Sequence, residues 1–333
     1  MRTVVTQDPD IIQDARQLHN HLWGIPPWAK YSPSPTPISL GREDMATMTN
    51  RPGTYMVTAK TDGERCSLVL GYPRSDPTRM YAVRFNRAGH PVHMVLRGVS
   101  PVCLPEDARA DILCGTLLDC EWLKDTQTLV LLDTLCICGY DLKTTGDFRK
   151  RMTLGALVVD AIDMGPIKMR CKPFMDLEHI GAIDPEEGAD GLVFMPTREK
   201  VHTGRSMSIF KWKAVHTVDA MFEKGRFVFR RQATSVPVSD LGIQVDIDDT
   251  RVDEGHVYEL KQVTHGTGEE DIRHFQIMCR RDDKIGAPNQ VDTVHHTLLH
   301  IDENLTHEEL TRTIQHSYSS SVQCPDHTVN VTP

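Results

Sequence analysis

The residues best suited to chemistry lie in one short run, Lys60-Thr61-Asp62-Gly63-Glu64-Arg65. A lysine amine is a good nucleophile once it loses its proton, and a neighbouring cation such as Arg65 favours that loss by penalising a second positive charge. Asp62 could hold a metal ion or orient the amine, and Gly63 lets the backbone approach a phosphate closely. The β-prone runs 55–59 and 66–70 predict a bend between two strands here. The plainer interpretation is a charged hairpin turn with Lys60 in solvent.

Charged residues of the kind that a phosphate site needs recur further along the chain. Asp119 and Glu121 alternate along a predicted strand and therefore share one face. Lys211 and Lys213 do the same, and two amines on one face repel unless an anion lies between them. Asp190 is a third acid, on another predicted strand. Separate carboxylates suit Mg²⁺, which combines a few of them with phosphate oxygens and waters.

Six elements occur in an order that resembles the covalent nucleotidyltransferases, which include ATP-dependent DNA ligases, RNA ligases and mRNA capping guanylyltransferases. They are Lys60-x-Asp62-Gly63-x-Arg65, Asp119-Cys120-Glu121, Leu132-Asp133 with the basic run 149–151 downstream, Asp190-Gly191-Leu192-Val193, Lys211-x-Lys213 and Arg281-x-Asp283-Lys284. In that superfamily the lysine attacks the α-phosphate of a nucleoside triphosphate, expels pyrophosphate and carries the nucleotide as a phosphoamide. The Thr217-Val218-Asp219 run and Pro288-Asn289 resemble capping enzymes specifically, and the compact layout is similar to the minimal enzymes of large DNA viruses.

The resemblance implies a role for each matched residue. Lys60 would be the catalytic nucleophile, and Glu121 and Asp190 would bind Mg²⁺ or Mn²⁺. Lys172 would select guanine, because its ammonium donates to O6, where adenine carries an amino group that cannot accept. The nucleotide-binding residues would be Asp62, Arg65, Arg87, Glu121, Leu132, Lys172, Val193, Lys211, Lys213, Arg281, Asp283 and Lys284.

The sequence departs from the family pattern at four positions. Asn86 precedes Arg87 where guanylyltransferases carry aspartate, and Cys120 stands in place of a glycine. Leu132 replaces the aromatic residue that stacks on guanine, so the base would be held by aliphatic contact, with Val193 on its other face. Leu132 is equally suited to the core. Ala214 replaces the proline usual after the second lysine.

The function that the resemblance implies is mRNA guanylyl transfer. GMP would pass from GTP through a lysine-bound intermediate to the 5′-diphosphate end of RNA and form the GpppN cap. No further domain for the triphosphatase or the methyltransferase of capping is evident, so we expect both on separate chains. We expect an intracellular protein, in the nucleus or in a viral replication compartment, the cytoplasm or a virion.

Composition is that of an ordinary soluble protein: 333 residues, 39% hydrophobic and 25% charged, with a formal net charge of −9. The negative charge argues against a protein that grips long duplexes through a broad basic face. An enzyme acting on one end of a nucleic acid needs only a local basic groove. No apolar run approaches the ~20 residues of a membrane span, and nine cysteines without a CxxC pair argue against a disulfide framework or a structural zinc.

The order of predicted elements indicates an α+β protein. Asp8-Pro9-Asp10 predicts a helix start, and mixed strands and helices fill a nucleotidyltransferase domain over 1–217. Short β runs over 218–305 predict an OB-fold barrel that acts as a lid. We expect 306–333 to form a C-terminal helix that packs back on the first domain, then a disordered tail after Ser317.

Two other functions remain open from the sequence. An ATP-dependent DNA or RNA ligase shares the lysine chemistry and differs in the nucleotide it accepts. A catalytically inactive scaffold of the same fold would bind RNA through its barrel, and the substitutions at Asn86, Cys120, Leu132 and Ala214 leave that possibility open.

Overall fold

The computed structural model describes residues 8–49, 53–104, 107–183, 189–247, 252–263, 272–284 and 286–322, with the side chains of 103–104, 107–110, 283 and 320–322 outside that part. Its residues form two compact units. The first holds the described residues of 1–40, 47–212 and 314–333, and the second holds 41–46 and 213–313. The sequence placed boundaries at 217 and 305, whereas the units divide after 212 and 313 and residues 41–46 group with the second unit.

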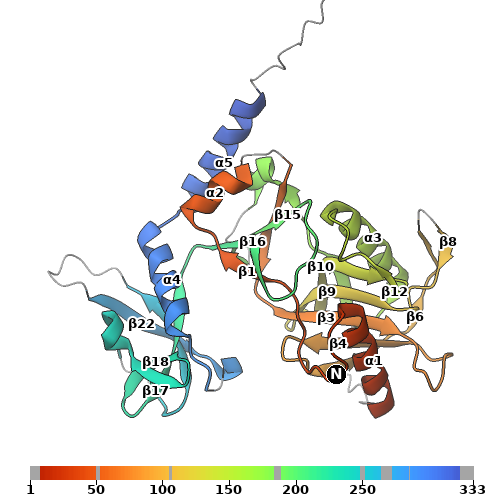
Figure 1. Cartoon of the computed structure of the whole chain (residues 1–333), viewed down its shortest axis with the longest axis horizontal. Helices are drawn as coiled ribbons and strands as arrows, with labels where there is room; N and C mark the ends of the chain where they lie inside the picture. Colours follow the sequence, from red (N-terminus) through yellow and green to blue (C-terminus); the bar gives the residue numbers. More distant parts are fainter. Residues whose placement is uncertain are drawn as a thin grey trace, which may run out of the picture. The chain divides into compact units, whose positions relative to one another are not determined.

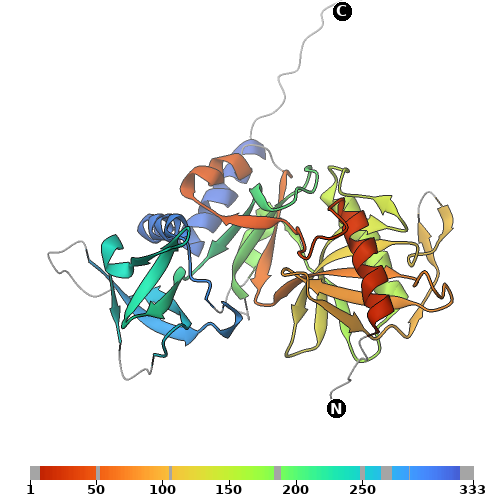
Figure 2. The same cartoon turned by 60° about the horizontal axis from the view of Figure 1, so that its bottom comes forward.

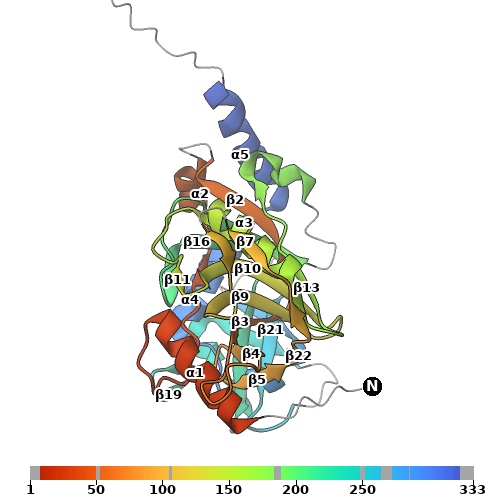
Figure 3. The same cartoon turned by 90° about the vertical axis from the view of Figure 1, so that its right-hand side faces the viewer.

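A seven-stranded sheet forms the centre of the first unit (Figure 1). Its order is β11-β10-β9-β3-β4-β5, with β13 added parallel to β10. The strands are β3 (Glu64–Gly71), β4 (Tyr81–Asn86), β5 (Pro91–Met94), β9 (Thr116–Leu123), β10 (Thr128–Ile137), β11 (Tyr140–Asp141) and β13 (Lys168–Cys171). Figure 3 shows β10, β9, β3, β4 and β5 side by side in that order.

Two helices cover opposite faces of this sheet, which explains why every residue of β10 is buried. The α1 helix (Pro9–Trp23) begins at Asp8, whose carboxylate caps the backbone N–H groups of Asp10 and Ile11. It packs on the odd-numbered residues of β3, such as Val69. Figure 2 shows α1, in red, lying across one face of the sheet.

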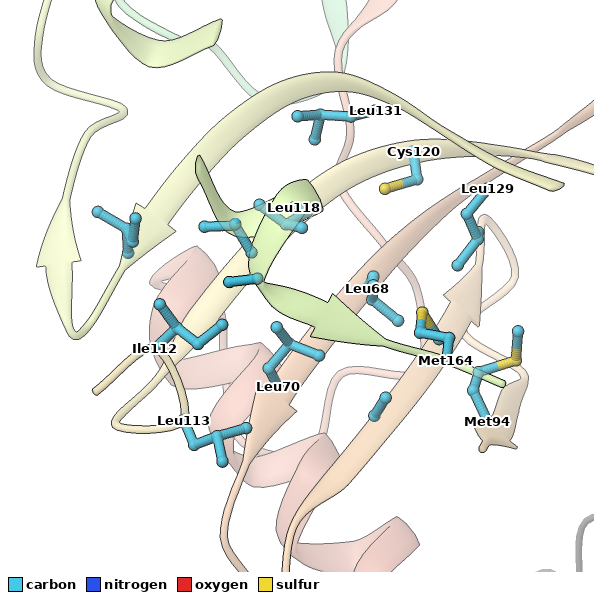
Figure 4. Close-up of a cluster of buried hydrophobic side chains, with 14 of the residues drawn as sticks. Leu68, Leu70, Met94, Ile112, Leu113, Leu118, Cys120, Leu129, Leu131 and Met164 are labelled. Carbon is cyan, nitrogen blue, oxygen red and sulfur yellow. The ribbon is translucent and has the colours of Figure 1, made fainter. Parts of the chain in front are cut away.

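The α3 helix (Phe148–Ala161) packs on the even-numbered residues of β3 on the other face. Leu68 and Leu70 lie there beside Leu118 and Cys120 of β9 and Leu129 and Leu131 of β10 (Figure 4). Period-two alternation along β3 and β9 thus divides their residues between two apolar layers.

A second, five-stranded sheet in the first unit has the order β1-β16-β15-β2-β14. The strands are β1 (Thr36–Ser39), β2 (Tyr55–Thr61), β14 (Met175–Asp176), β15 (Ala189–Pro196) and β16 (Arg205–Lys213). The smaller elements of this unit are the pairs β6 (Gly98–Val99) with β12 (Ile162–Asp163) and β7 (Val102–Leu104) with β8 (Asp107–Ala110), and the 3₁₀-helix η1 (Leu177–Ala182). β2 and β3 belong to different sheets, so the predicted bend joins two sheets and is not a hairpin turn.

The second unit is built on a six-stranded sheet in the order β19-β18-β17-β21-β22-β20. Its elements are β17 (Thr217–Glu223), β18 (Arg226–Arg231), β19 (Thr234–Pro237), η2 (Val238–Leu241), β20 (Ile243–Asp246), β21 (Val257–Gln262), β22 (Arg273–Arg280), η3 (Asp282–Lys284) and α4 (Val291–Glu303). One core joins the strands to α4, with Phe229, Leu260 and Phe275 fully buried.

The two edge strands of this sheet, β19 and β20, are consecutive in the chain and joined by η2 alone. A flat six-stranded sheet would separate its edges by about 24 Å, which is more than six residues of chain can span at about 3.5 Å each. The sheet therefore curls. Its edges are not hydrogen-bonded to each other among the described residues, so the curled sheet is not a closed barrel there.

Two helices contain residues of both units, α2 (Arg42–Thr49) and α5 (His307–Val322). In the second unit Arg42 pairs with Glu309. In the first unit the backbone N–H of Gly53 donates to the hydroxyl of Tyr318 at 3.3 Å. The chain is helical as far as Val322, so the disorder predicted after Ser317 is wrong for 318–322. The fold class is α+β, and no helix among the described residues is long and apolar enough to cross a membrane.

Gly155 allows α3 to lie directly on β10, since a Cβ atom there would come within 2.1 Å of Thr134 Oγ1 and 2.5 Å of Leu131 Cδ2. We expect Gly155→Ala to lower the free energy of unfolding by about 1–3 kcal/mol through overpacking, although alanine favours helix by about 1 kcal/mol. Urea denaturation measures the change. Thr153→Ala, at an exposed position of the same helix, is the control and keeps wild-type stability. A Gly155→Ala protein as stable as the control would contradict this packing.

Candidate active site

The chain crosses from β2 to β3 through Asp62 and Gly63. A Cβ atom on Gly63 would lie 2.6 Å from Glu121 Cγ and 3.0 Å from the Trp122 carbonyl oxygen. Only glycine fits here, because the crossing presses against β9. The glycine is thus required by packing on β9, whereas the sequence interpretation assigned it to phosphate approach. The crossing fixes Lys60 at the end of one sheet and Arg65 at the start of the other.

Lys60 forms an ion pair with Asp190, with Nζ 2.7 Å from Oδ1. Thr61 pairs with Ala189 and Ala59 pairs with Leu192, so β15 places two residues opposite the single residue Lys60. Such a bulge turns a side chain toward its partner strand. The predicted nucleophile and the predicted metal-directed acid therefore meet in the structure.

A chain of hydrogen bonds links Lys172 to Glu121 through Thr61. Lys172 Nζ donates to Thr61 Oγ1 at 2.6 Å, and that hydroxyl donates to Glu121 Oε2 at 2.5 Å. Burial lowers the pKa of Lys172 to about 8, against the opposing effect of Glu121, and the positive charges of Arg170 and Lys60 add to the lowering. Thr61 holds the Lys172 amine and the Glu121 carboxylate in one fixed arrangement.

Arg65 and Asp119 form a bidentate ion pair at the base of the site. Arg65 Nε and Nη2 lie 2.7 and 2.5 Å from the two oxygens of Asp119, whose side chain is 1% exposed. Burial opposes the charge of Arg65, but Asp119 outweighs it, so the pKa of Arg65 is raised. The sequence assigned Asp119 no binding role. Its position two residues before Glu121, opposite Ser67 of β3, explains how it reaches Arg65.

A second bidentate pair, Asp133 with Arg151, lies deeper. Arg151 Nε and Nη2 are 2.8 and 3.0 Å from the carboxylate oxygens of Asp133, and Nη1 donates to the Thr145 carbonyl at 2.8 Å. Burial raises the pKa of Asp133, although Arg151 opposes this shift. The aspartate at the end of the apolar strand and the basic run downstream, which the sequence matched as one family element, thus meet in one interaction.

A pocket opens between the two sheets of the first unit above these groups. Its polar lining is Thr58, Lys60, Thr61, Arg65, Glu121 and Lys172, and its apolar lining includes Pro35, Pro37, Leu132, Phe174, Val193, Met195 and Ile209. Leu132 and Val193 thus lie where the sequence placed them, beside Lys172. The shape and lining suit a planar heterocycle between apolar walls with a charged group at its edge.

Phe174 is the aromatic residue that sequence reasoning missed. It lines the pocket and packs edge-on against Phe148, with ring centroids 4.8 Å apart and planes at 83°. The family pattern places its aromatic residue directly before Asp133, where this chain has Leu132. The signal was the spacing Lys172-x-Phe174, since residues two apart on an extended chain face the same way. Thr61 was missed for a similar reason, as an uncharged residue inside a charged motif.

Several predicted binding residues lie outside the pocket lining. Asp62 is exposed. Arg87 is exposed and donates to Thr36 Oγ1 at 3.3 Å. Lys211 and Lys213 flank the buried Trp212 on β16, as alternation predicts, and are half-buried. Lys211 belongs to the first unit and Lys213 to the second.

In the second unit Asp219 gathers the predicted cations. Arg281 Nη1 lies 3.3 Å from Asp219 Oδ1, and Lys284 pairs with Oδ2 of the same carboxylate. Asn289 donates its side-chain amide to Asp219 at 3.4 Å, and its Oδ1 accepts the Asp219 backbone N–H at 2.8 Å. The capping-specific runs Thr217-Val218-Asp219 and Pro288-Asn289 therefore build one cluster. The side chain of Asp283 lies outside the described residues.

The family model of the mRNA capping enzyme catalytic domain matches residues 3–215, which is more than half of the chain. The chain belongs to the mRNA capping enzyme family. It is a nucleotidyltransferase, and the family's catalytic domain transfers a nucleotide through a covalent intermediate.

Solved structures with a similar chain trace are DNA ligases. A mycobacterial DNA ligase D complexed with ATP and MES is 13% identical with a TM-score of 0.42, over 76% of this chain and 96% of that one. The ATP-dependent DNA ligase of bacteriophage T7, in complex with ATP, is 11% identical with a TM-score of 0.36, over 75% of this chain and 98% of that one.

Capping enzymes and their relatives use a nucleoside triphosphate with a divalent metal ion, and the donors here fit that use. Glu121 contributes a carboxylate to the pocket wall, and Asp190 contributes another where it contacts Lys60. No group of three or more His, Cys, Asp or Glu side chains is arranged to hold a metal in the described part of the chain. Isolated carboxylates suit an ion that takes its other ligands from phosphate and water.

The buried Asp133–Arg151 pair provides a stability test. We expect Arg151→Met to lower the free energy of unfolding by about 3–5 kcal/mol, because it leaves the Asp133 carboxylate buried without a partner. Combining it with Asp133→Leu restores part of the loss. The matched control is Arg149→Met on the same helix, which breaks an exposed pair with Asp176 and costs about 1 kcal/mol or less. Equal losses in the two single variants, measured by urea denaturation, would contradict the assignment.

Proposed function

We propose that this capping enzyme is a GTP:RNA guanylyltransferase that carries GMP on Lys60. The observation that supports this most directly is the position of Lys60, which lies in the pocket wall together with the Lys172 amine and near two separate carboxylates, Asp190 and Glu121. A nucleotide with its base between Leu132, Val193 and Phe174 would extend its phosphates toward Lys60 and Arg65.

The base preference follows from Lys172. As an ammonium it has only donors, and guanine O6 is an acceptor at the purine edge where adenine has an amino group. Thr61 occupies one of its three hydrogens, which fixes the direction of the remaining two. A buried donor left without an acceptor by the wrong base costs binding energy, so GTP is favoured over ATP. This distinguishes the enzyme from an ATP-using ligase.

The reaction has two steps. In the first, Lys60 separates from Asp190 and gives a proton to solvent, and its Nζ lone pair forms a bond to the α-phosphorus of GTP while the bond to the bridging oxygen breaks and pyrophosphate leaves. The nitrogen of the new P–N bond gives a second proton to solvent. Arg65, fixed by Asp119, stabilises negative charge near the transferred group. In the second step, a β-phosphate oxygen of RNA forms a bond to the same phosphorus, the P–N bond breaks, and the Lys60 nitrogen takes back two protons from solvent.

A bound Mg²⁺ or Mn²⁺ would polarise the phosphate oxygens, and Glu121 and Asp190 are the residues that would hold it. In the second unit the Asp219 cluster keeps Arg281 and Lys284 together, and we propose that they serve the β- and γ-phosphates, as the family resemblance implies. The triphosphatase and methyltransferase of capping belong to other chains in this proposal.

Lys60→Ala tests the nucleophile. We expect this variant to form no protein–GMP adduct from α-labelled GTP, and Lys60→Arg to fail likewise because a guanidinium keeps its proton. The measurement is the label retained on denatured protein. Lys168→Ala, which removes an exposed lysine outside the pocket, forms the adduct at the wild-type rate. A labelled Lys60→Ala protein would place the nucleophile elsewhere.

The lowered pKa of Lys172 predicts a pH-dependent base preference. Below pH 8 the side chain is charged and only donates, which favours guanine. As pH rises through about 8 it becomes a neutral amine that also accepts, and it can then accept from the adenine amino group. We therefore expect the GTP-to-ATP ratio of adduct rates to fall between pH 7 and 9.

Taking the ratio cancels the ionisation of Lys60, since both nucleotides react with the same amine. Lys172→Arg is the control, because arginine stays charged over this range and its ratio does not change with pH. A GTP-to-ATP ratio of adduct rates that does not change with pH in the wild-type enzyme would contradict the role of Lys172 in base selection.

A further inference from the structure

The connector between α1 and β1 carries two exposed aromatic side chains. Trp28 is 79% exposed, the most exposed large apolar side chain among the described residues, and Tyr31 is 51% exposed. Ala29 between them is buried. Tryptophan is on average a highly buried residue, so two uncovered rings this close in the chain call for a ligand.

The backbone that carries these rings is held rigidly. The buried Asn20 amide nitrogen lies 3.2, 3.0 and 3.1 Å from the carbonyl oxygens of Pro26, Pro27 and Ala29. Beyond Tyr31, the buried Ser32 hydroxyl lies 2.7 Å from Ser67 Oγ on β3. The aromatic residues therefore project from a fixed segment. A platform that is already ordered loses little entropy when a ligand stacks on it.

Cations surround the same segment. Arg87 donates to Thr36 Oγ1 at 3.3 Å, and its backbone carbonyl accepts from the Ser32 N–H at 3.1 Å. Arg16 donates to the Gly89 carbonyl at 2.7 Å, and that glycine touches the backbone of Lys30. Within the described residues neither Lys30 nor Arg87 is ion-paired with a carboxylate. These two charges remain available to phosphates.

The segment leads directly into the nucleotide pocket. Pro35 and Pro37 line the pocket, and Pro35 is four Cα–Cα steps along the chain from Tyr31, a span of at most about 14 Å. Figure 2 shows this part of the chain running from the end of α1 to β1. Arg87 touches the connector at both Ser32 and Thr36 and so lies along the path between the aromatic residues and the pocket.

We propose that Trp28 and Tyr31 stack on the first bases of the acceptor RNA, with Lys30 and Arg87 on its phosphates. Aromatic rings interleaved with cations are the recurring surface for single-stranded nucleic acid, and only a single strand has bases free to stack. The 5′-diphosphate of a strand bound here points along the connector toward Lys60. This inference rests on the guanylyltransferase function proposed above, because it names the binding site of that reaction's second substrate.

The two half-reactions, adduct formation and GMP transfer to RNA, can be measured separately. This distinguishes an effect on RNA binding from an effect on the chemistry at Lys60. We expect Trp28→Ala to form the Lys60 adduct at the wild-type rate and to transfer GMP to a ten-nucleotide 5′-diphosphate RNA with a KM raised about 5- to 100-fold and an unchanged kcat. Transfer to ADP, which is too short to reach the connector, stays at the wild-type rate. Trp28→Phe keeps a stacking ring and most of the RNA affinity. Tyr140→Ala, at an exposed tyrosine of β11, is the matched control without effect.

Binding can be read without catalysis. Of the four tryptophans, Trp23, Trp122 and Trp212 are buried, so quenching of intrinsic fluorescence by an unreactive single-stranded RNA reports Trp28. We expect quenching in the wild type, none in Trp28→Phe, and none with duplex RNA.

Each outcome decides between the proposals. A wild-type enzyme that makes no GMP adduct, or transfers to no RNA, contradicts the proposed function. The quenching experiment still tests RNA binding by Trp28 and Tyr31 in that case. A Trp28→Ala enzyme that transfers to long RNA with wild-type KM, or a wild-type protein without quenching, contradicts RNA stacking on Trp28 and Tyr31. Neither result contradicts the proposed function. Equal impairment with ADP and long RNA also contradicts the stacking, because stacking acts only on the longer acceptor.

Discussion

The active site depends on the passage of the chain from β2 to β3 within two residues. This passage is possible because Gly63 lies against β9 with no room for a side chain. Two sheets that share no strand are thereby joined at their polar ends, with Lys60 on one and Arg65 on the other. The pocket between the sheets follows from that junction, and so does its lining by residues from both.

Each charge deep in the pocket has a partner. Arg65 is fixed by Asp119, Arg151 by Asp133, and Lys60 by Asp190, while Thr61 connects Lys172 with Glu121. Because uncompensated charges in such a site are costly, this pairing lets the protein keep several cations together without a ligand. In the mechanism proposed above, Lys60 separates from Asp190 when the triphosphate reacts, whereas Arg65 remains paired with Asp119. The formal charge of −9 is no guide to this local arrangement.

The second unit also holds its cations with a carboxylate. Asp219 is nearly buried and contacts Arg281, Lys284 and Asn289, which lie more than sixty residues away in the chain. A single acid thus keeps two cations on one side of the curled sheet. The sheet curls because η2 is too short to join the edges of a flat one, and one apolar core joins β17 with β22 and α4.

The sequence alone determined the residue types and their order: the lysine motif, the spaced acids, the lysine pair and the final cationic run, together with α1, α3 and an α+β class. These are local properties, since propensity, alternation and capping act over a few residues. Only the tertiary structure decided which of these groups meet. It placed Asp190 on Lys60 through a bulge, Asp119 on Arg65 and Phe174 in the pocket, and it left the sheet of the second unit open. Contacts between residues fifty or more positions apart depend on strand register and sheet order, and no periodicity within a single strand encodes either.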